Sequence, residues 1–225
     1  MGDIQWQYIF DVPLAIESFP YIFQGIWYTL LISFASMGIG LVIGFFLALG
    51  RMSKYAILRW PTRVYISFMR GIPMLVFLFL LYFGLPIIGI KFSAITAALI
   101  GFSLNSAAYM AEINRSALAA VNKGQWEAAT ALGLSYWQTM KSIILPQATK
   151  IAVPPLSNVL LDLIKASSLA AMITVPDLFQ RAKIVGGREL DYMTMYILVA
   201  FIYWGTCSIV AVWQDKLEKK YQYTD

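Results

Sequence analysis

Three polar residues share one face of a predicted apolar helix. Asn158, Asp162 and Lys165 have the spacing i, i+4 and i+7, which places them in one row. Asp162 is about 16 Å from the start of its run at 1.5 Å per residue, near the middle of a bilayer core. A carboxylate there costs about 2.5–3.5 kcal/mol unless it has a partner or a function. Either this face binds a ligand, or Asp162 and Lys165 only neutralise one another.

A second polar row occupies the preceding apolar run. Asn105, Tyr109 and Glu112 have the same spacing, and Asn105 also lies about 16 Å from the start of its run. An amino acid zwitterion needs an acceptor for its ammonium group, and Asp162 with an asparagine from either row can supply it. The competing interpretation is interhelical hydrogen bonding without a ligand. Glu112 is expected to form a structural pair with Arg115.

Donors for a carboxylate are expected around Arg70 and the Gly71-Ile72-Pro73 segment that follows it. Pro73 removes a backbone hydrogen bond from its helix. Broken helices at membrane depth usually line a cavity, although a packing kink is an equal alternative. Arg70 is predicted roughly 10 Å inside the membrane, so its guanidinium can also snorkel to the cytoplasmic headgroups.

The composition argues against an enzyme. The 225 residues include no histidine, which removes the commonest general base and metal ligand. The single Cys207 excludes an internal disulfide and a cysteine metal cluster. No Gly-x-x-x-x-Gly-Lys-Ser/Thr loop occurs, so ATP cannot be hydrolysed at such a site on this chain. We therefore expect no catalytic residue, metal or cofactor here.

The chain is 60% hydrophobic and 13% charged, which is typical of an integral membrane protein rather than a soluble domain. Five apolar runs are long enough to cross a bilayer. They predict an all-α membrane protein with one transmembrane domain over residues 1–225. The predicted helices are 21–50, 64–88, 93–120, 151–173 and 192–213.

Basic residues predict the orientation. Residues 51–63, 115–150 and 216–220 hold eleven of the seventeen Lys and Arg residues, and five spans place these three segments on one side. These basic loops explain the net charge of +5, so the charge does not indicate that the protein binds nucleic acid. The N-terminus carries Asp3 and no Lys or Arg before residue 20, so we do not expect it to be a secretory signal. We expect the N-terminus outside and the C-terminus in the cytoplasm. The loop 176–191 is the exception to the charge rule, because this orientation places it outside although it is basic.

The cytoplasmic segment 122–150 is predicted to hold two short helices. Gly133 is the expected stop of the first, over 125–132, and Ser135 the expected cap of the second. Pro146 is expected to end or kink that second helix. Small residues in the first helix allow another surface to approach closely. The alternative is an amphipathic helix lying on the bilayer.

One motif in this segment favours a docking function. Glu127-Ala128-Ala129, then Gly133, then Ile143 and Leu145-Pro146 resembles the EAA motif of the membrane subunits of binding-protein-dependent ABC importers, with every fixed position present. In that family the short helix inserts into a groove of the cytoplasmic ATPase.

The resemblance extends over nearly the whole chain and points to the polar amino acid permeases. The matching stretches are 68–73, 105–115, 124–127 and 165–169, while Trp126, 136–140 and 175–179 look most like the cystine-type members. Two positions depart from the family pattern. Ile72 replaces a threonine, and Ala166 replaces an aspartate.

The resemblance implies the type I ABC importer permease fold in the inner membrane of a bacterium. Its implied partners are a pair of ABC ATPases that bind ATP and Mg²⁺, an external substrate-binding protein and a second permease chain, identical or homologous. The implied cargo is L-cystine, with a basic amino acid or glutamine as the alternative. A stand-alone ion-coupled carrier, with Asp162 and Glu112 as its relay, is the other class; the missing internal repeat disfavours it.

The resemblance and the polar rows together define two sets of candidate site residues. The ATPase-coupling set is Gly124, Gln125, Glu127, Ala128, Ala129, Gly133, Leu145 and Pro146. The substrate-path set is Arg70, Gly71, Ile72, Pro73, Asn105, Tyr109, Asn158, Asp162, Lys165, Ser167 and Ser168.

Overall fold

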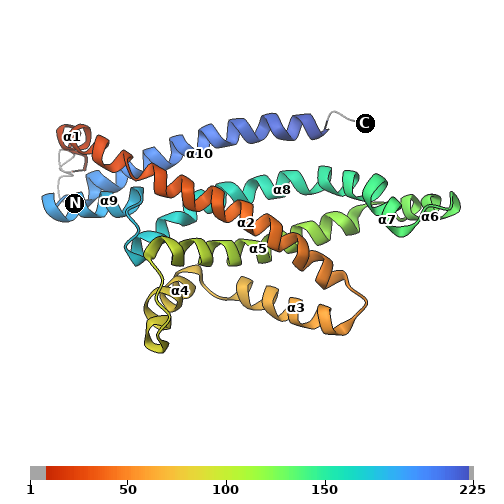
Figure 1. The fold of residues 1–225 in the computed structure, drawn as a ribbon. Coiled ribbons are helices and arrows are strands. Elements are labelled where there is room, and N and C mark those ends of the chain that lie inside the picture. Colours follow the sequence, from red (N-terminus) through yellow and green to blue (C-terminus); the bar gives the residue numbers. More distant parts are fainter. Residues whose placement is uncertain (1–8, 223–225) are drawn as a thin grey trace, which may run out of the picture. The chain divides into compact units, whose positions relative to one another are not determined.

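The computed structural model describes residues 9–222, and it contains helices but no strand within that range. Asp3 lies outside the described residues, and so does the side chain of Lys220. Figure 1 shows the helices in chain order. The bounds of the four long helices are α2 Ile26–Met52, α5 Ala94–Ala120, α8 Leu145–Ala166 and α10 Tyr192–Gln222. The shorter helices are α1 Val12–Phe23, α3 Ala56–Gly71, α4 Met74–Phe79, α6 Lys123–Ala131, α7 Tyr136–Thr139 and α9 Leu178–Glu189.

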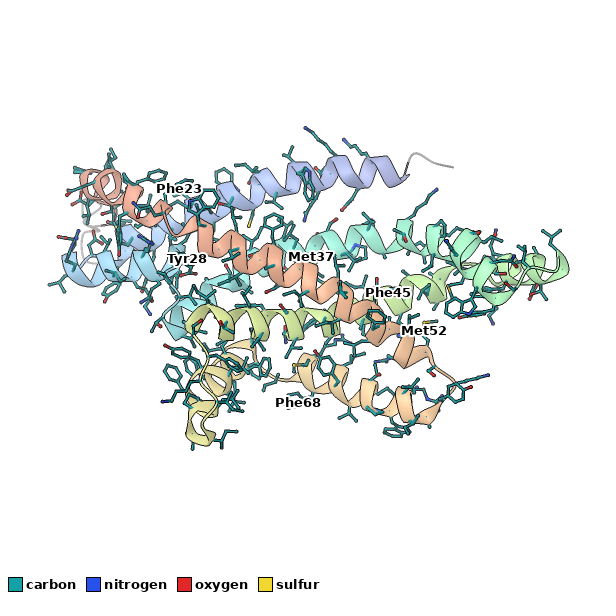
Figure 2. All side chains as sticks on the ribbon, in the orientation of Figure 1. Phe23, Tyr28, Met37, Phe45, Met52 and Phe68 are labelled. Atoms are coloured by element: carbon teal, nitrogen blue, oxygen red, sulfur yellow. The ribbon has the colours of Figure 1, made fainter. Side chains whose placement is uncertain are left out.

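The first predicted run, 21–50, is divided between two helices. Helix α1 begins after Asp11, whose side chain accepts a hydrogen bond from the Leu14 amide. It ends at Phe23, and α2 begins at Ile26. Apolar side chains then follow α2 from Tyr28 through Met37 and Phe45 to Met52 (Figure 2). The hydrophobic run alone did not reveal the division, because both helices are apolar.

The second predicted run, 64–88, begins earlier and is broken. Helix α3 starts at Ala56 and stops at Gly71, and Ile72 and Pro73 have extended backbone angles before α4. A π-helical turn over Leu80–Gly84 and a 3-10 turn over Leu85–Ile88 complete this stretch. Of the two alternatives for Pro73, a broken helix or a packing kink, the structure shows the broken helix.

The remaining runs agree better with the prediction. Helix α5 matches 93–120 within one residue. The fourth helix starts at residue 145 instead of 151 and passes into a 3-10 segment, Ser167–Ile173. Helix α10 continues to residue 222, beyond the predicted end at 213. The loop expected at 176–191 instead contains α9.

Within residues 9–222, four helices are long and apolar enough to cross a membrane, or five spans if the broken pair over residues 56–88 counts as one. The higher of these two numbers equals the five spans predicted.

The described chain forms two compact units. The first comprises residues up to 36, 73–102 and 161–211, and the second comprises 37–72, 103–160 and 212 onward. A core of the first unit joins α9 to the starts of α2 and α10 through Ile26, Leu178, Val185 and Met195. A core of the second joins the end of α5 to the segment that leads into α8, through Leu118, Val121, Met140 and Ile144.

Candidate functional site

Helix α6 carries the Glu-Ala-Ala motif, and local signals fix both of its ends. Asn122 caps its start, because the Asn122 Oδ1 accepts a hydrogen bond from the Gly124 amide at 2.8 Å. At its end Gly133 has a φ of +75°, which glycine adopts without a steric penalty. The amides of Gly133 and Leu134 then bond back to the Thr130 and Ala129 carbonyls. The stop predicted at Gly133 is confirmed.

A capping box starts the next helix. The Ser135 hydroxyl accepts from the Gln138 amide, while the Gln138 side chain accepts from the Ser135 amide at 2.8 Å. This confirms the predicted cap. The Trp126 and Tyr136 rings stack with centroids 5.6 Å apart, which joins α6 to α7. The pair of short helices is therefore an ordered hairpin and not a free loop.

The hairpin is anchored on one side and open on the other. Ala129 is 1% exposed, and Trp126 packs against the core formed by α5 and the segment before α8. Glu127 and Ala128 are exposed, and so are Gly124 and Gln125. Leu132, Tyr136 and Trp137 are 78%, 58% and 74% exposed. An apolar tip on a fixed base is what a docking helix needs.

Pro146 does not end the helix, so the first of its two predicted effects, ending or kinking the helix, is wrong. The helical path continues without interruption from Tyr136 to Ile173. The last residues before it, Met140–Ile144, form a π-helical turn in which the Leu145 amide donates to the Met140 carbonyl. Leu145 and Pro146 follow this π-helical turn directly, and the chain stays helical across both. Leu145 is half-buried and Pro146 is exposed.

The polar face predicted for α8 is present. Asn158, Asp162 and Lys165 are all exposed along one side of the helix. Asp162 Oδ1 lies 2.9 Å from Lys165 Nζ, with the two side chains 73% and 62% exposed. The ion pair that was one of the two alternatives for this face thus forms, and both of its side chains are exposed. Ser167 is fully buried and Ser168 is half-buried, and each hydroxyl donates to the carbonyl three residues before it.

Asn105 makes the interhelical hydrogen bond that was the alternative to ligand binding. The Asn105 Nδ2 donates to the Met69 carbonyl at 2.7 Å, one turn before the break at Ile72. This bond fixes the end of α3 on α5 in the second unit. The Arg70 guanidinium lies 5.5 Å from the centroid of the exposed Tyr109 ring, a cation–π arrangement. Gly71 has open space around it.

Glu112 joins two arginines rather than one. Its Oε2 lies 3.3 Å from Arg115 Nη2, which confirms the expected pair. Its Oε1 lies 2.8 Å from Arg51 Nη1, a second ion pair that connects α5 to the end of α2. The sequence did not reveal this partner, because residues so far apart in the chain carry no spacing signal.

Asp177 is a buried carboxyl group that the sequence analysis missed. It caps α9 by accepting from the Gln180 amide at 2.8 Å, and it accepts from the Tyr203 hydroxyl at 3.4 Å. Burial raises its pKa to about 7, and the hydrogen bonds from Gln180 and Tyr203 lower it less. Its place just before a run that begins Leu178-Phe179 was the available cap signal.

The fold and the hairpin define a class: a multi-pass helical membrane protein with a short, largely exposed helix, α6, between two of its long helices. The profile of the family "Binding-protein-dependent transport system inner membrane component" matches residues 40–223. The chain belongs to this family.

Two relatives and one solved structure narrow the class. The chain is 73% identical to the probable amino-acid ABC transporter permease YckA of Bacillus subtilis, over 98% of both chains. It is 41% identical to the L-cystine transport system permease TcyB of the same organism, over 92% of this chain and 89% of that one.

A crystal structure described as an amino acid ABC transporter with histidines has a TM-score of 0.89 and 33% identity, covering 93% of this chain and 98% of that one. The chain therefore has the type I importer permease fold and is an amino acid ABC importer permease, not itself an ATPase.

Proposed function

We propose that this permease translocates a polar amino acid by alternating access, driven by a cytoplasmic pair of ABC ATPases that bind ATP and Mg²⁺. The observation that carries the proposal is the α6–α7 hairpin, with Glu127 and Ala128 exposed on a base fixed by Ala129. A helix held in this way transmits a movement of its partner to α5 and α8, which pack beneath it.

The proposed assembly follows from this docking. An external binding protein delivers the substrate, and a second permease chain, identical or homologous, completes the pathway. The excess of basic residues in 51–63, 115–150 and 216–220 supports a cytoplasmic location for the hairpin and the C-terminus, with the N-terminus outside.

L-cystine is the favoured cargo. Support comes from the likeness to the cystine permease TcyB and from the exposed Asp162–Lys165 pair, which offers both charges to a zwitterion. A basic amino acid is the alternative, because Asp162 alone suits a cationic side chain. Glutamine is the third candidate. The exposed row on α8 is the proposed path, with Asn158 as the neutral member.

A substrate panel tests the proposal. The chain is purified with the ATPase and binding protein of its own transport system, and ATPase activity is measured with cystine, arginine, lysine and glutamine. We expect cystine to stimulate hydrolysis most. A larger response to arginine or lysine would reassign the cargo. Failure of the chain to associate with any ATPase would overturn the function itself.

A further inference from the structure

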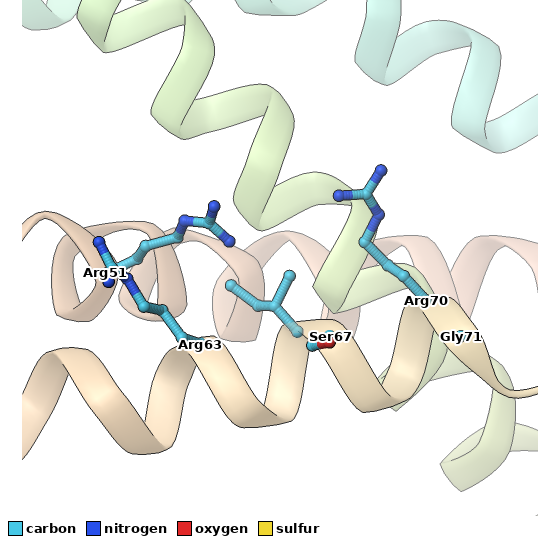
Figure 3. A pocket seen from close by; sticks show the side chains of 6 residues that line it. Arg51, Arg63, Ser67, Arg70 and Gly71 are labelled. Carbon is cyan, nitrogen blue, oxygen red and sulfur yellow. The ribbon is translucent and has the colours of Figure 1, made fainter.

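Three arginines border one cavity beside α3 in the second unit. The cavity has a volume of about 610 Å³ and is lined by Arg51, Arg63, Ile66, Ser67, Arg70 and Gly71. Ligand sites commonly measure about 300–1,000 Å³. In Figure 3 Arg51 and Arg63 lie together at one end of this groove, and Arg70 lies at the other end. We call this cavity the basic groove.

The charges in the basic groove are not balanced by this chain. Glu112 pairs with Arg51 and also with Arg115, so its single negative charge is shared between two cations. Within the described part of the chain, no ion pair is seen for Arg63 or for Arg70. A cluster of guanidinium groups that outnumber the carboxylates beside them is stabilised by an added anion, and arginine binds phosphate through two parallel hydrogen bonds.

The anion is indicated by the neighbouring face of the same helix. Arg63, Ser67 and Arg70 form one row of α3 with the spacing i, i+4 and i+7. Beside it runs an apolar row whose side chains are also uncovered: Ile57 is 83%, Trp60 62%, Val64 61% and Phe68 54% exposed. A helix with a basic row next to an exposed apolar row containing Trp is typical of a membrane interface.

We propose that the basic groove binds the headgroup of an anionic phospholipid, with its acyl chains lying along the apolar row of α3. A phosphate is held at Arg63 with Arg51, or at Arg70, and the Ser67 hydroxyl adds a donor. Arg63 and Arg70 are seven residues apart, about 10 Å along the helix, so the groove has room for two anionic groups. Basic pockets between membrane helices are known to take such headgroups.

A passing amino acid is the other occupant to consider. Its carboxylate would satisfy one guanidinium, but it would have no use for the adjacent apolar row. The lipid accounts for both rows of α3 at once. Lipid binding at the basic groove is independent of ATP and of which amino acid is carried.

Thermal unfolding of the purified full chain in a neutral detergent tests the site. Short-chain phosphatidylglycerol and cardiolipin should raise the midpoint by several degrees more than short-chain phosphatidylcholine, because a ligand that binds only the folded state stabilises it. Arg63→Gln should lose at least half of this difference, and Arg63→Gln with Arg70→Gln should abolish it. Lys54→Gln removes the same charge from an exposed side chain outside the groove and should keep the full effect.

Native mass spectrometry supplies a second measurement that does not require unfolding. The wild-type chain and Lys54→Gln should retain phosphatidylglycerol, and the double variant should lose it at least tenfold. Equal stabilisation by phosphatidylcholine would overturn the proposal. So would a full effect of glycerol phosphate, which has no acyl chain. If cystine or arginine raised the unfolding midpoint in a way that depends on Arg63, and lipid did not, the groove would be a substrate-binding site instead.

Discussion

Asp177 combines full burial with a structural function at the start of α9. Its carboxyl group caps this helix, and its backbone lies so close to Gly25 that a Cβ added there would come within 2.5 Å of it. The start of α9 is therefore packed closely against the residue that precedes α2. The Asp177 pKa of about 7 is the energetic consequence of the burial.

This raised pKa predicts that the protein loses stability as the pH rises from 5 to 7. The folded state keeps the proton, whereas the unfolded carboxyl group loses it near its ordinary pKa of 3.8. The folded state thus binds more protons in this window, and its stability falls by up to about 1.4 kcal/mol per pH unit. Above about pH 7 the carboxyl group is deprotonated in both states, so it no longer makes the stability depend on pH. Thermal unfolding in detergent between pH 5 and 8 measures it.

Asp177→Asn provides the matched test, because asparagine also caps a helix but does not titrate. The variant should unfold at nearly the same temperature at pH 5 and pH 8. Glu17→Gln, which changes an exposed carboxyl group on α1, should keep the pH dependence of the wild type. A pH dependence unchanged in Asp177→Asn would contradict the assignment.

Asp162 is the residue that most directly tests the substrate path. Its pair with Lys165 is exposed, and such pairs contribute about 0–1 kcal/mol. Asp162→Asn should therefore fold normally. We expect it to weaken substrate stimulation of ATPase activity in the assembled transporter, because the acceptor for the ammonium group is lost. An unchanged response, compared with Glu17→Gln, would leave Asp162 as a partner of Lys165 only.

Helices α2 and α5 approach closely in the second unit through two glycines. A Cβ added to Gly44 would lie 2.9 Å from the Ala107 carbonyl oxygen, and one added to Gly40 would lie 2.5 Å from Ser106 Oγ. Gly38, two residues before Gly40, has nothing within 4 Å of its added Cβ. Only two of these three glycines are thus needed for packing.

Gly44→Ala and Gly38→Ala should consequently have opposite effects. The first forces two backbones apart and should destabilise the protein by about 1–3 kcal/mol. The second meets open space and gains helix propensity, so its unfolding temperature should equal or exceed that of the wild type. Thermal unfolding in detergent compares the pair. Equal losses in both variants would contradict the close contact.

The sequence predicted those elements whose signals are local. Gly133 ended α6, Ser135 capped α7, and the spacing of Asn158, Asp162 and Lys165 placed them on one exposed face. It did not predict α1 or α9, because apolar periodicity does not separate two consecutive apolar helices or find a polar one in a loop. The contact of Arg51 with Glu112 and the burial of Asp177 depend on packing between distant segments, which spacing does not encode.

At the scale of the whole molecule, the permease is not itself an ATPase, so the proposed transport requires a partner that hydrolyses ATP. The α6–α7 hairpin is fixed to α5 and to the start of the long helical path that ends at Ile173. A force applied to the hairpin therefore acts directly on the helix that carries Asp162 and Lys165. This connection is the physical basis for the proposed transport by an external ATPase.

Uptake by the reconstituted transporter tests this central claim. Permease and ATPase are reconstituted in liposomes, with ATP on the side of the membrane that the hairpin faces and the binding protein on the other side. Uptake of labelled amino acid is then measured. Glu127→Lys reverses an exposed charge on α6 and should leave assembly intact while abolishing ATP-driven uptake. Asp215→Lys, the same reversal at an exposed position of α10, should transport normally. Normal uptake by Glu127→Lys would contradict the account.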